Sequence, residues 1–165
     1  GDTIGLPHYQ LRVIFWIILI DYWDNTDLIT VTLTDNNGFS EIKTTKRANS
    51  LTRRRTCGVV NDQEDYIRFD SVFTHNLTDV NLKVSVKTNN TNSQAFWGIK
   101  ELLVYARVCH DYCLECYGGL STMCRACDTG YKLSNNTCNS TCQSGFGVTS
   151  DDSLCVWCDL RCLVC

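Results

Sequence analysis

Apolar and polar residues alternate in several short segments of the first 108 residues, a period that is typical of β-strands with one buried face. In Leu28–Thr34 three apolar residues alternate with threonines, and Val80–Lys87 repeats the pattern with valine, leucine and polar residues. The polar run Asp35–Gly38 predicts a hairpin turn. The expected strands cover residues 9–22, 28–34, 39–45, 66–74, 80–87 and 99–108. With no convincing helix, this pattern predicts a mainly β fold, an antiparallel β-sandwich over residues 1–108.

The first long strand is apolar on both faces. The run Val13–Ile20 is eight residues long, far short of the ~20 that a membrane-spanning helix needs, so it predicts a buried strand without a membrane span. A strand with one wet face would alternate with polar residues. We therefore expect the second face to be covered, either by loops or the rest of the chain, or by another subunit. The residues of that second face are Ile14, Trp16, Ile18 and Ile20.

The cysteines divide the chain. Eleven of the 12 lie in residues 109–165, which contain few large apolar side chains. Such a segment buries too little area to offset the loss of chain entropy and needs disulfides. The spacing of Cys109, Cys113 and Cys116 recurs 49 residues later at Cys158, Cys162 and Cys165. We therefore expect a second domain over 109–165, with one full copy of a repeat at 109–157, the start of another copy, and a longer repetitive parent protein.

Zinc is the alternative to disulfides, because C-x2-C pairs occur four times. Only seven residues separate Cys116 from Cys124, whereas zinc ribbons place ~15–20 residues between their cysteine pairs. His110 is the sole histidine of this segment, and the three histidines of the chain lie far apart in sequence without an evident metal set. Disulfides are favoured, and they imply secretion. N-glycosylation sequons, which fit the same compartment, begin at Asn76, Asn89, Asn135 and Asn139.

Charge and motifs exclude several classes of function. The net charge of −3 lacks the basic excess of a nucleic-acid binder or a polybasic membrane-surface protein. The sequence contains no nucleophile elbow, zinc-protease motif, phosphate-binding loop or dinucleotide fingerprint. We expect no enzymatic activity, and no cofactor other than covalent N-glycans and, at one loop, a calcium ion.

The cysteine segment carries a family resemblance. The sequence CHDYCLECYGGLSTMCRACDTGYKLSNNTCNSTCQSGFGV resembles the furin-like, growth-factor-receptor type of cysteine-rich repeat. Spacing alone leaves 105 pairings open for eight cysteines. The resemblance implies one pairing, with disulfides Cys109–Cys116, Cys113–Cys124, Cys127–Cys138, Cys142–Cys155 and Cys158–Cys165.

Two cysteines are left over by that pairing, namely Cys57 and Cys162. Each pairs beyond the ends of this chain, or the two cross-link neighbouring subunits, or Cys57 is a buried free thiol. The number of cysteines does not separate these alternatives.

The first domain resembles another module. The segments LPHYQLRVIFWIILIDYWDN, CG, HNLTDVNLKVSV and FWGIKELLVYARVC are similar to the galactose-binding-like jelly-roll of very large cysteine-rich surface proteins of ciliates and other protists. In those proteins this module directly precedes furin-like repeats. The resemblance implies a structural segment of an extracellular or cell-surface assembly, a filament, appendage or coat, whose partners are copies of itself or other segments of the same long protein. The alternative is a glycan- or ligand-binding module of an adhesin or receptor.

Two candidate binding sites follow the first strand. Asp21, Asp24 and Asp27 offer the oxygen ligands that Ca²⁺ prefers, and jelly-roll modules often hold calcium at such a loop. The alternative is a polar strand end with Asx turns. The aromatic residues Tyr22, Trp23 and Trp97 offer faces for a sugar ring, or else pack at the rim of the sandwich.

Overall fold

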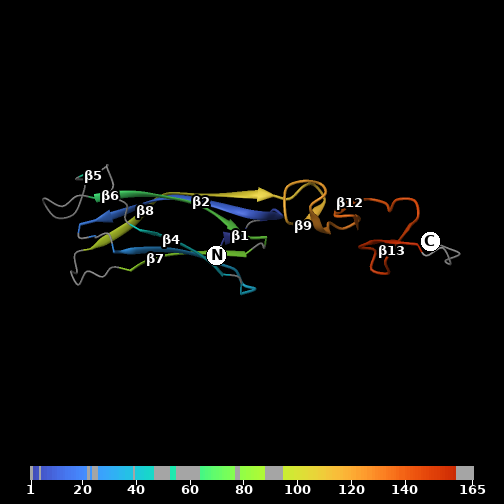
Figure 1. Ribbon diagram of the computed structural model, residues 1–165, viewed down its shortest axis with the longest axis horizontal. Coiled ribbons are helices and arrows are strands. Elements are labelled where there is room, and N and C mark those ends of the chain that lie inside the picture. The colour runs from blue at the N-terminus through green and yellow to red at the C-terminus, as the bar shows by residue number, and fades with distance from the viewer. Residues whose placement is uncertain are drawn as a thin grey trace. The chain divides into compact units, whose positions relative to one another are not determined.

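Regular structure in this chain is entirely β wherever it is described (Figure 1). A computed structural model describes residues 2–3, 5–21, 23, 26–38, 40–46, 53–54, 64–76, 79–87 and 95–158. The predicted mainly β, antiparallel and disulfide-rich fold class is confirmed. The strands are β1 (Asp2–Thr3), β2 (His8–Ile20), β3 (Leu28–Thr34), β4 (Ser40–Lys46), β5 (Arg53–Arg54), β6 (Glu64–Thr74), β7 (Asp79–Lys87), β8 (Phe96–Val108), β9 (Cys113–Cys116), β10 (Cys124–Cys127), β11 (Lys132–Ser134), β12 (Thr137–Asn139), β13 (Phe146–Val148) and β14 (Cys155–Trp157).

Eight strands form two four-stranded sheets, with the orders β1-β7-β3-β4 and β5-β6-β2-β8. Strand β3 pairs antiparallel with both β4 and β7 along its whole length. The turn after β3 follows the sequence, because the Asn37 backbone N–H donates to the Asp35 carboxylate at 2.8 Å and Gly38 has a φ of 87°. Only glycine adopts that backbone angle without steric cost, so the predicted hairpin forms there.

The core lies on the inner faces of these sheets. Leu11, Val13, Phe15, Ile17 and Leu19 of β2 are at most 1% exposed, as are Ile29, Val31 and Leu33 of β3. Phe15 stacks on Phe69 of β6, with ring centroids 4.9 Å apart. Each such side chain contributes ~1.5–3 kcal/mol on burial. Every second residue of β2 and the apolar residues of the alternating β3 therefore face this core.

Strand β8 differs from this pattern, because its apolar side chains are exposed on both faces. Leu102 and Leu103, neighbours that point to opposite faces, are 50% and 48% exposed. Among the described strands β8 lies at the edge of its sheet, beside β2. The outward residues of β2 that the sequence assigns to a covered face, Ile14, Trp16, Ile18 and Ile20, are half-buried.

The chain divides into two compact units. The first comprises Gly1–Thr3, Leu11–Phe73 and Asp79–Tyr105, and the second comprises Ile4–Gln10, Thr74–Thr78 and Ala106–Cys165. The second unit thus contains the cysteine-rich segment together with strand ends that the sequence places in the sandwich domain. Its own sheets are three two-stranded ones, β9–β10, β11–β12 and β13–β14. No helix able to span a bilayer occurs in the described ranges.

Candidate functional site: the disulfide-stapled repeat

Three β-hairpins carry six of the nine described cysteines of the second unit, and Cys109, Cys142 and Cys158 lie outside their strands. Strand β9 pairs with β10 in an irregular antiparallel register that places Cys116 opposite Cys124. The hairpin of β11 and β12 turns at Asn135 and Asn136, whose φ angles of 49° and 60° are both positive. Two consecutive positive angles are typical of a type I′ turn, and asparagine tolerates them well. The residues between the cysteines thus specify tight turns, which bring distant sulfur atoms together.

Four disulfides cross-link these hairpins. They join Cys109 to Cys116, Cys113 to Cys124, Cys127 to Cys138 and Cys142 to Cys155. Their Cα–Cα distances of 5.4–5.7 Å lie within the range of ordinary disulfides. These are the same pairs that the resemblance to furin-like repeats implies.

The remaining cysteines are less fully described. Cys158 is also disulfide-bonded. Its predicted partner Cys165, together with Cys57 and Cys162, lies outside the described residues.

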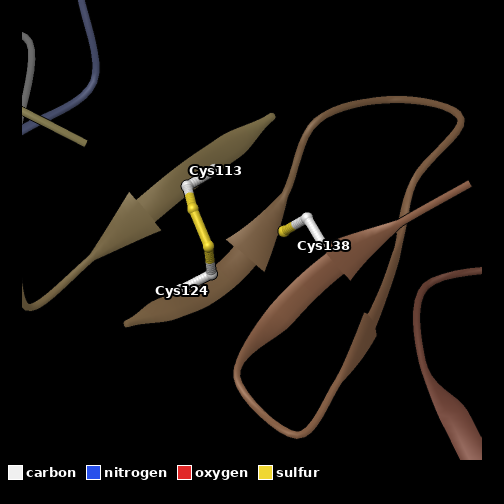
Figure 2. A group of neighbouring side chains, drawn as sticks. All are labelled: Cys113, Cys124 and Cys138. Carbon is white, nitrogen blue, oxygen red and sulfur yellow. A yellow bond between two sulfur atoms is a disulfide. The ribbon is translucent and has the colours of Figure 1, made fainter. Parts of the chain in front are cut away.

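Sulfur atoms form the centre of this unit. Cys113, Cys116 and Cys124 are 4%, 2% and 1% exposed, and Tyr9, Cys109, Leu133 and Cys138 pack against them. Figure 2 shows the Cys113–Cys124 disulfide bridging two strands, with the Cys138 sulfur pointing toward it from a third. These three sulfur atoms lie within 4.8 Å of one another. Such a cluster could suit zinc, but each of the three is bonded to another sulfur, so none offers the thiolate that zinc requires.

Aromatic stacking reinforces the cross-links. Tyr112 and Tyr131 stack with ring centroids 4.1 Å apart and an interplanar angle of 17°. The Asp128 backbone N–H donates to the Tyr112 carbonyl at 2.9 Å. A side-chain hydrogen bond to Tyr112 and, after it, burial raise the pKa of Tyr131. Further along, Phe146 and Trp157 meet edge to face at 5.1 Å across β13 and β14. Disulfides and ring contacts therefore hold these hairpins together.

The structure brings together two histidines that nothing in the sequence pairs. His8 and His75 are 1% and 3% exposed, and His8 Nε2 lies 3.0 Å from His75 Nδ1. His8 Nδ1 lies 2.9 Å from the Leu6 carbonyl. Because a carbonyl only accepts, His8 Nδ1 donates, and in the neutral pair His8 Nε2 accepts from His75. The sequence did not indicate this contact, because the two residues lie 67 positions apart.

This histidine pair does not make a metal site with other described residues, because the cysteine cluster is the sole group of three candidate ligands found among them. The pair ties the start of β2 to the end of β6. The sequence predicts this contact only if β2 and β6 are already known to be neighbours in one sheet.

A small cavity of about 280 Å³ lies beside the first disulfide. Its wall is partly apolar, with Leu6, Pro7 and Val108, and it also carries Asp111 and Asp128. Ligand pockets usually measure ~300–1,000 Å³, so this one is at the small end. No motif in the sequence predicts it.

The predicted calcium residues are only partly described. Asp21 and Asp27 are buried, at 8% and 1% exposure, and Asp24 lies outside the described residues. Two carboxylates fall short of the six to eight oxygen ligands that Ca²⁺ takes. The calcium site stays a prediction.

The predicted sugar-stacking residues behave differently from one another. The Trp23 indole N–H lies within hydrogen-bonding distance of the Ile20 and Phe96 carbonyls, at 3.0 and 2.8 Å, and its side chain is 7% exposed. Trp23 is therefore a packing residue, which is the alternative that the sequence left open. Trp97 is 39% exposed, and Tyr22 lies outside the described residues.

The predicted glycosylation sites differ in exposure. Asn76 and Asn135 are exposed, and Asn139 is half-buried. Asn89 lies outside the described residues. Glycan attachment at these positions stays a prediction.

Comparison with known proteins gives one short match. The sequence is 42% identical over 40 residues, 23% of this chain, to "Cysteine repeat modular protein 2" of Tetrahymena thermophila. The chain spans 2% of the length of that protein. No model of a known protein family matches the sequence, and no solved structure matches it.

The match and the disulfide-rich hairpins together fit a protein with cysteine-rich repeats. They are compatible with an extracellular structural or surface module. The relationship of the first unit to galactose-binding jelly-rolls stays a prediction.

Proposed function

We propose that this chain is a structural segment of an extracellular, glycosylated assembly such as a filament, appendage or surface coat. The observation that carries the proposal is the sulfur-centred second unit, in which four disulfides take the place of a large apolar core. Such bonds persist only in an oxidising compartment. The proposal assigns the chain no catalytic role.

The energetics of the cross-links support a mechanical role. The four disulfides join residues separated by 7 to 13 positions, and loops of this size are each stabilised by ~2.5–3 kcal/mol, mainly by constraining the unfolded chain. A module held in this way resists extension and proteolysis because its covalent loops cannot open. Tandem copies of such a module contact mainly their neighbours and form an elongated array.

Exposed polar and apolar features support the same role. Asn76 and Asn135 are exposed, and glycans there would keep the surface hydrated. The half-buried outer face of β2 and the exposed β8 offer apolar surface for contacts between copies. The alternative role, glycan recognition by the sandwich, has weaker support because Trp23 is buried. Calcium at Asp21 and Asp27 would stiffen the loop before β3 in either role.

Surface labelling tests the proposal. An antibody raised against this chain should label unpermeabilised cells of the organism that carries the gene. The labelled protein should shift in mobility on N-glycosidase treatment and should resist extraction until a thiol reductant is added. Labelling confined to permeabilised cells, with unmodified asparagines and free thiols, would reject the proposal.

A further inference from the structure

Strand β8 is an edge strand whose exposed side chains are unusually apolar. Eight of its large apolar side chains are between 39% and 56% exposed, namely Phe96, Trp97, Ile99, Leu102, Leu103, Val104, Tyr105 and Val108. Natural edge strands are ordinarily short or carry charges and bulges that prevent pairing with another chain. β8 has 13 residues and no proline, and its protection is limited to three charged residues, Lys100, Glu101 and Arg107, and to one irregularity at Glu101.

The exposed area is large enough for a stable contact. At about half of the ~150–250 Å² that a large side chain can bury, eight side chains expose on the order of 700 Å², divided between the two faces of the strand. The largest apolar patch of a typical monomer is ~300–600 Å². A standard interface buries ~800 Å² per partner, and the backbone edge of β8 and the neighbouring side chains of β2 supply the remainder.

One irregularity divides the strand. Glu101 has a φ of 58°, which is the left-handed region that a β-bulge uses. Beyond it, Arg107 donates to Gln10 at 3.3 Å, and Tyr105 contributes to the raised pKa of Arg12, whose main cause is a hydrogen bond to Asp70. Arg107 therefore lies on the same side of β8 as Gln10 of the neighbouring β2.

The charged residues of β8 favour one register for pairing between two copies of the strand. In an antiparallel pair centred on Val104, regular pairing covers residues 102–106, beyond the irregularity at Glu101, and Leu103 lies opposite Tyr105. Arg107 of the other copy then comes next to Glu101, twice by symmetry, where Glu101 also pairs with Lys100 of its own chain at 2.9 Å. Moving the centre by one residue places Arg107 opposite Ile99 or Leu103, and moving it by half a residue places Arg107 opposite Lys100 or Leu102. Among these registers, the one centred on Val104 gives each Arg107 an acidic partner.

We propose that a second copy of this chain pairs with β8, antiparallel and centred on Val104, to join two four-stranded sheets into one sheet of eight strands. The contact is symmetric, as most contacts between identical chains are. This inference rests on the proposed structural function and names its partner and its surface. The main contact between copies is then β8 itself and not the outward face of β2, whose residues Ile14, Trp16, Ile18 and Ile20 lie beside it.

Charge reversal tests the register. The secreted chain of 165 residues should sediment as a concentration-dependent dimer between about 1 and 100 µM. Arg107→Glu places Glu next to Glu101 twice and should weaken dimerisation by about tenfold or more. The double variant E101R/R107E restores opposite charges and should recover most of the affinity, less a small loss because Lys100 then lies next to an arginine. Lys83→Glu, an exposed residue of β7 in the other sheet, is the matched control and should leave dimerisation unchanged.

Hydrogen exchange of the wild-type chain provides a second readout that needs no variant. Backbone amides of residues 102–107 should exchange more slowly at 100 µM than at 1 µM, whereas those of β3 should not change. A monomer at all concentrations overturns the proposal, and so does an oligomer that R107E leaves intact or that E101R/R107E fails to recover. Surface labelling would be unaffected by these outcomes, so failure of the β8 contact is distinguishable from failure of the structural role.

Discussion

The buried disulfide Cys113–Cys124 should stabilise the repeat more than the outer disulfide Cys142–Cys155. Their sequence separations are similar, 11 and 13 residues, so removing either cross-link releases about 3 kcal/mol of unfolded-chain entropy at 25 °C. The sites differ in burial, because Cys113 and Cys124 are 4% and 1% exposed whereas Cys142 and Cys155 are half-buried.

Serine in place of each cysteine separates these two contributions. A hydroxyl buried in an apolar cluster without a full hydrogen-bond partner costs ~1–3 kcal/mol. We therefore expect C113S/C124S to destabilise the second unit by about 5 kcal/mol and C142S/C155S by about 3 kcal/mol. Since a whole domain is stable by only ~5–15 kcal/mol, the first variant should leave residues 109–139 largely unfolded.

Native-state hydrogen exchange of peptides from residues 109–158 measures the difference. C113S/C124S should accelerate exchange across β9 to β12, and C142S/C155S should accelerate it mainly in β13 and β14. Equal losses in the two variants, or a larger loss at the outer pair, would refute the reasoning that burial of sulfur adds to the cross-link.

Three further results are expected. Asp70→Asn removes a carboxylate whose pKa is lowered, mainly by the hydrogen bond from Arg12. The stability that Asp70 adds should therefore be present above about pH 4 and should be lost as the pH falls through the lower pKa of the folded state. Urea unfolding of both proteins at several pH values measures this, and a difference from wild type that grows toward low pH would contradict it. Phe15→Ala, at a fully buried position, should cost ~3–5 kcal/mol in denaturant unfolding, and a cost below about 1 kcal/mol would refute the proposed core. Asn135→Gln should remove more N-glycan from the secreted protein than Asn139→Gln, because Asn135 is exposed and Asn139 half-buried; the reverse order on glycopeptide mapping would contradict this.

Local alternation predicted the strands well where one face packs and the other meets solvent. β3 has the predicted bounds, residues 28–34, because its threonines and aliphatic residues separate cleanly between two faces. β2 was also expected, but because both of its faces are apolar, its sequence did not indicate what covers the outward face. The exposure of β8 was missed, because a run such as Leu102–Tyr105 indicates a preference for burial without indicating whether anything covers it.

Tertiary contacts were harder to predict than strands. The disulfide pairs follow from the resemblance, since spacing alone allowed 105 combinations. The contact of His8 with His75, residues 67 positions apart, required the order of strands in the sheet. Tyr9 lies in the sandwich domain by sequence but packs against the sulfur cluster. The change in cysteine content at Cys109 gives no sign of this contact.

Peptide mapping of the protein without reduction shows whether sulfur–sulfur bonds, rather than an apolar core, fold the second unit. We expect cross-linked peptides that join Cys109 to Cys116, Cys113 to Cys124, Cys127 to Cys138 and Cys142 to Cys155. Free thiols at these eight positions in a folded protein, or stoichiometric zinc released when they are alkylated, would contradict it.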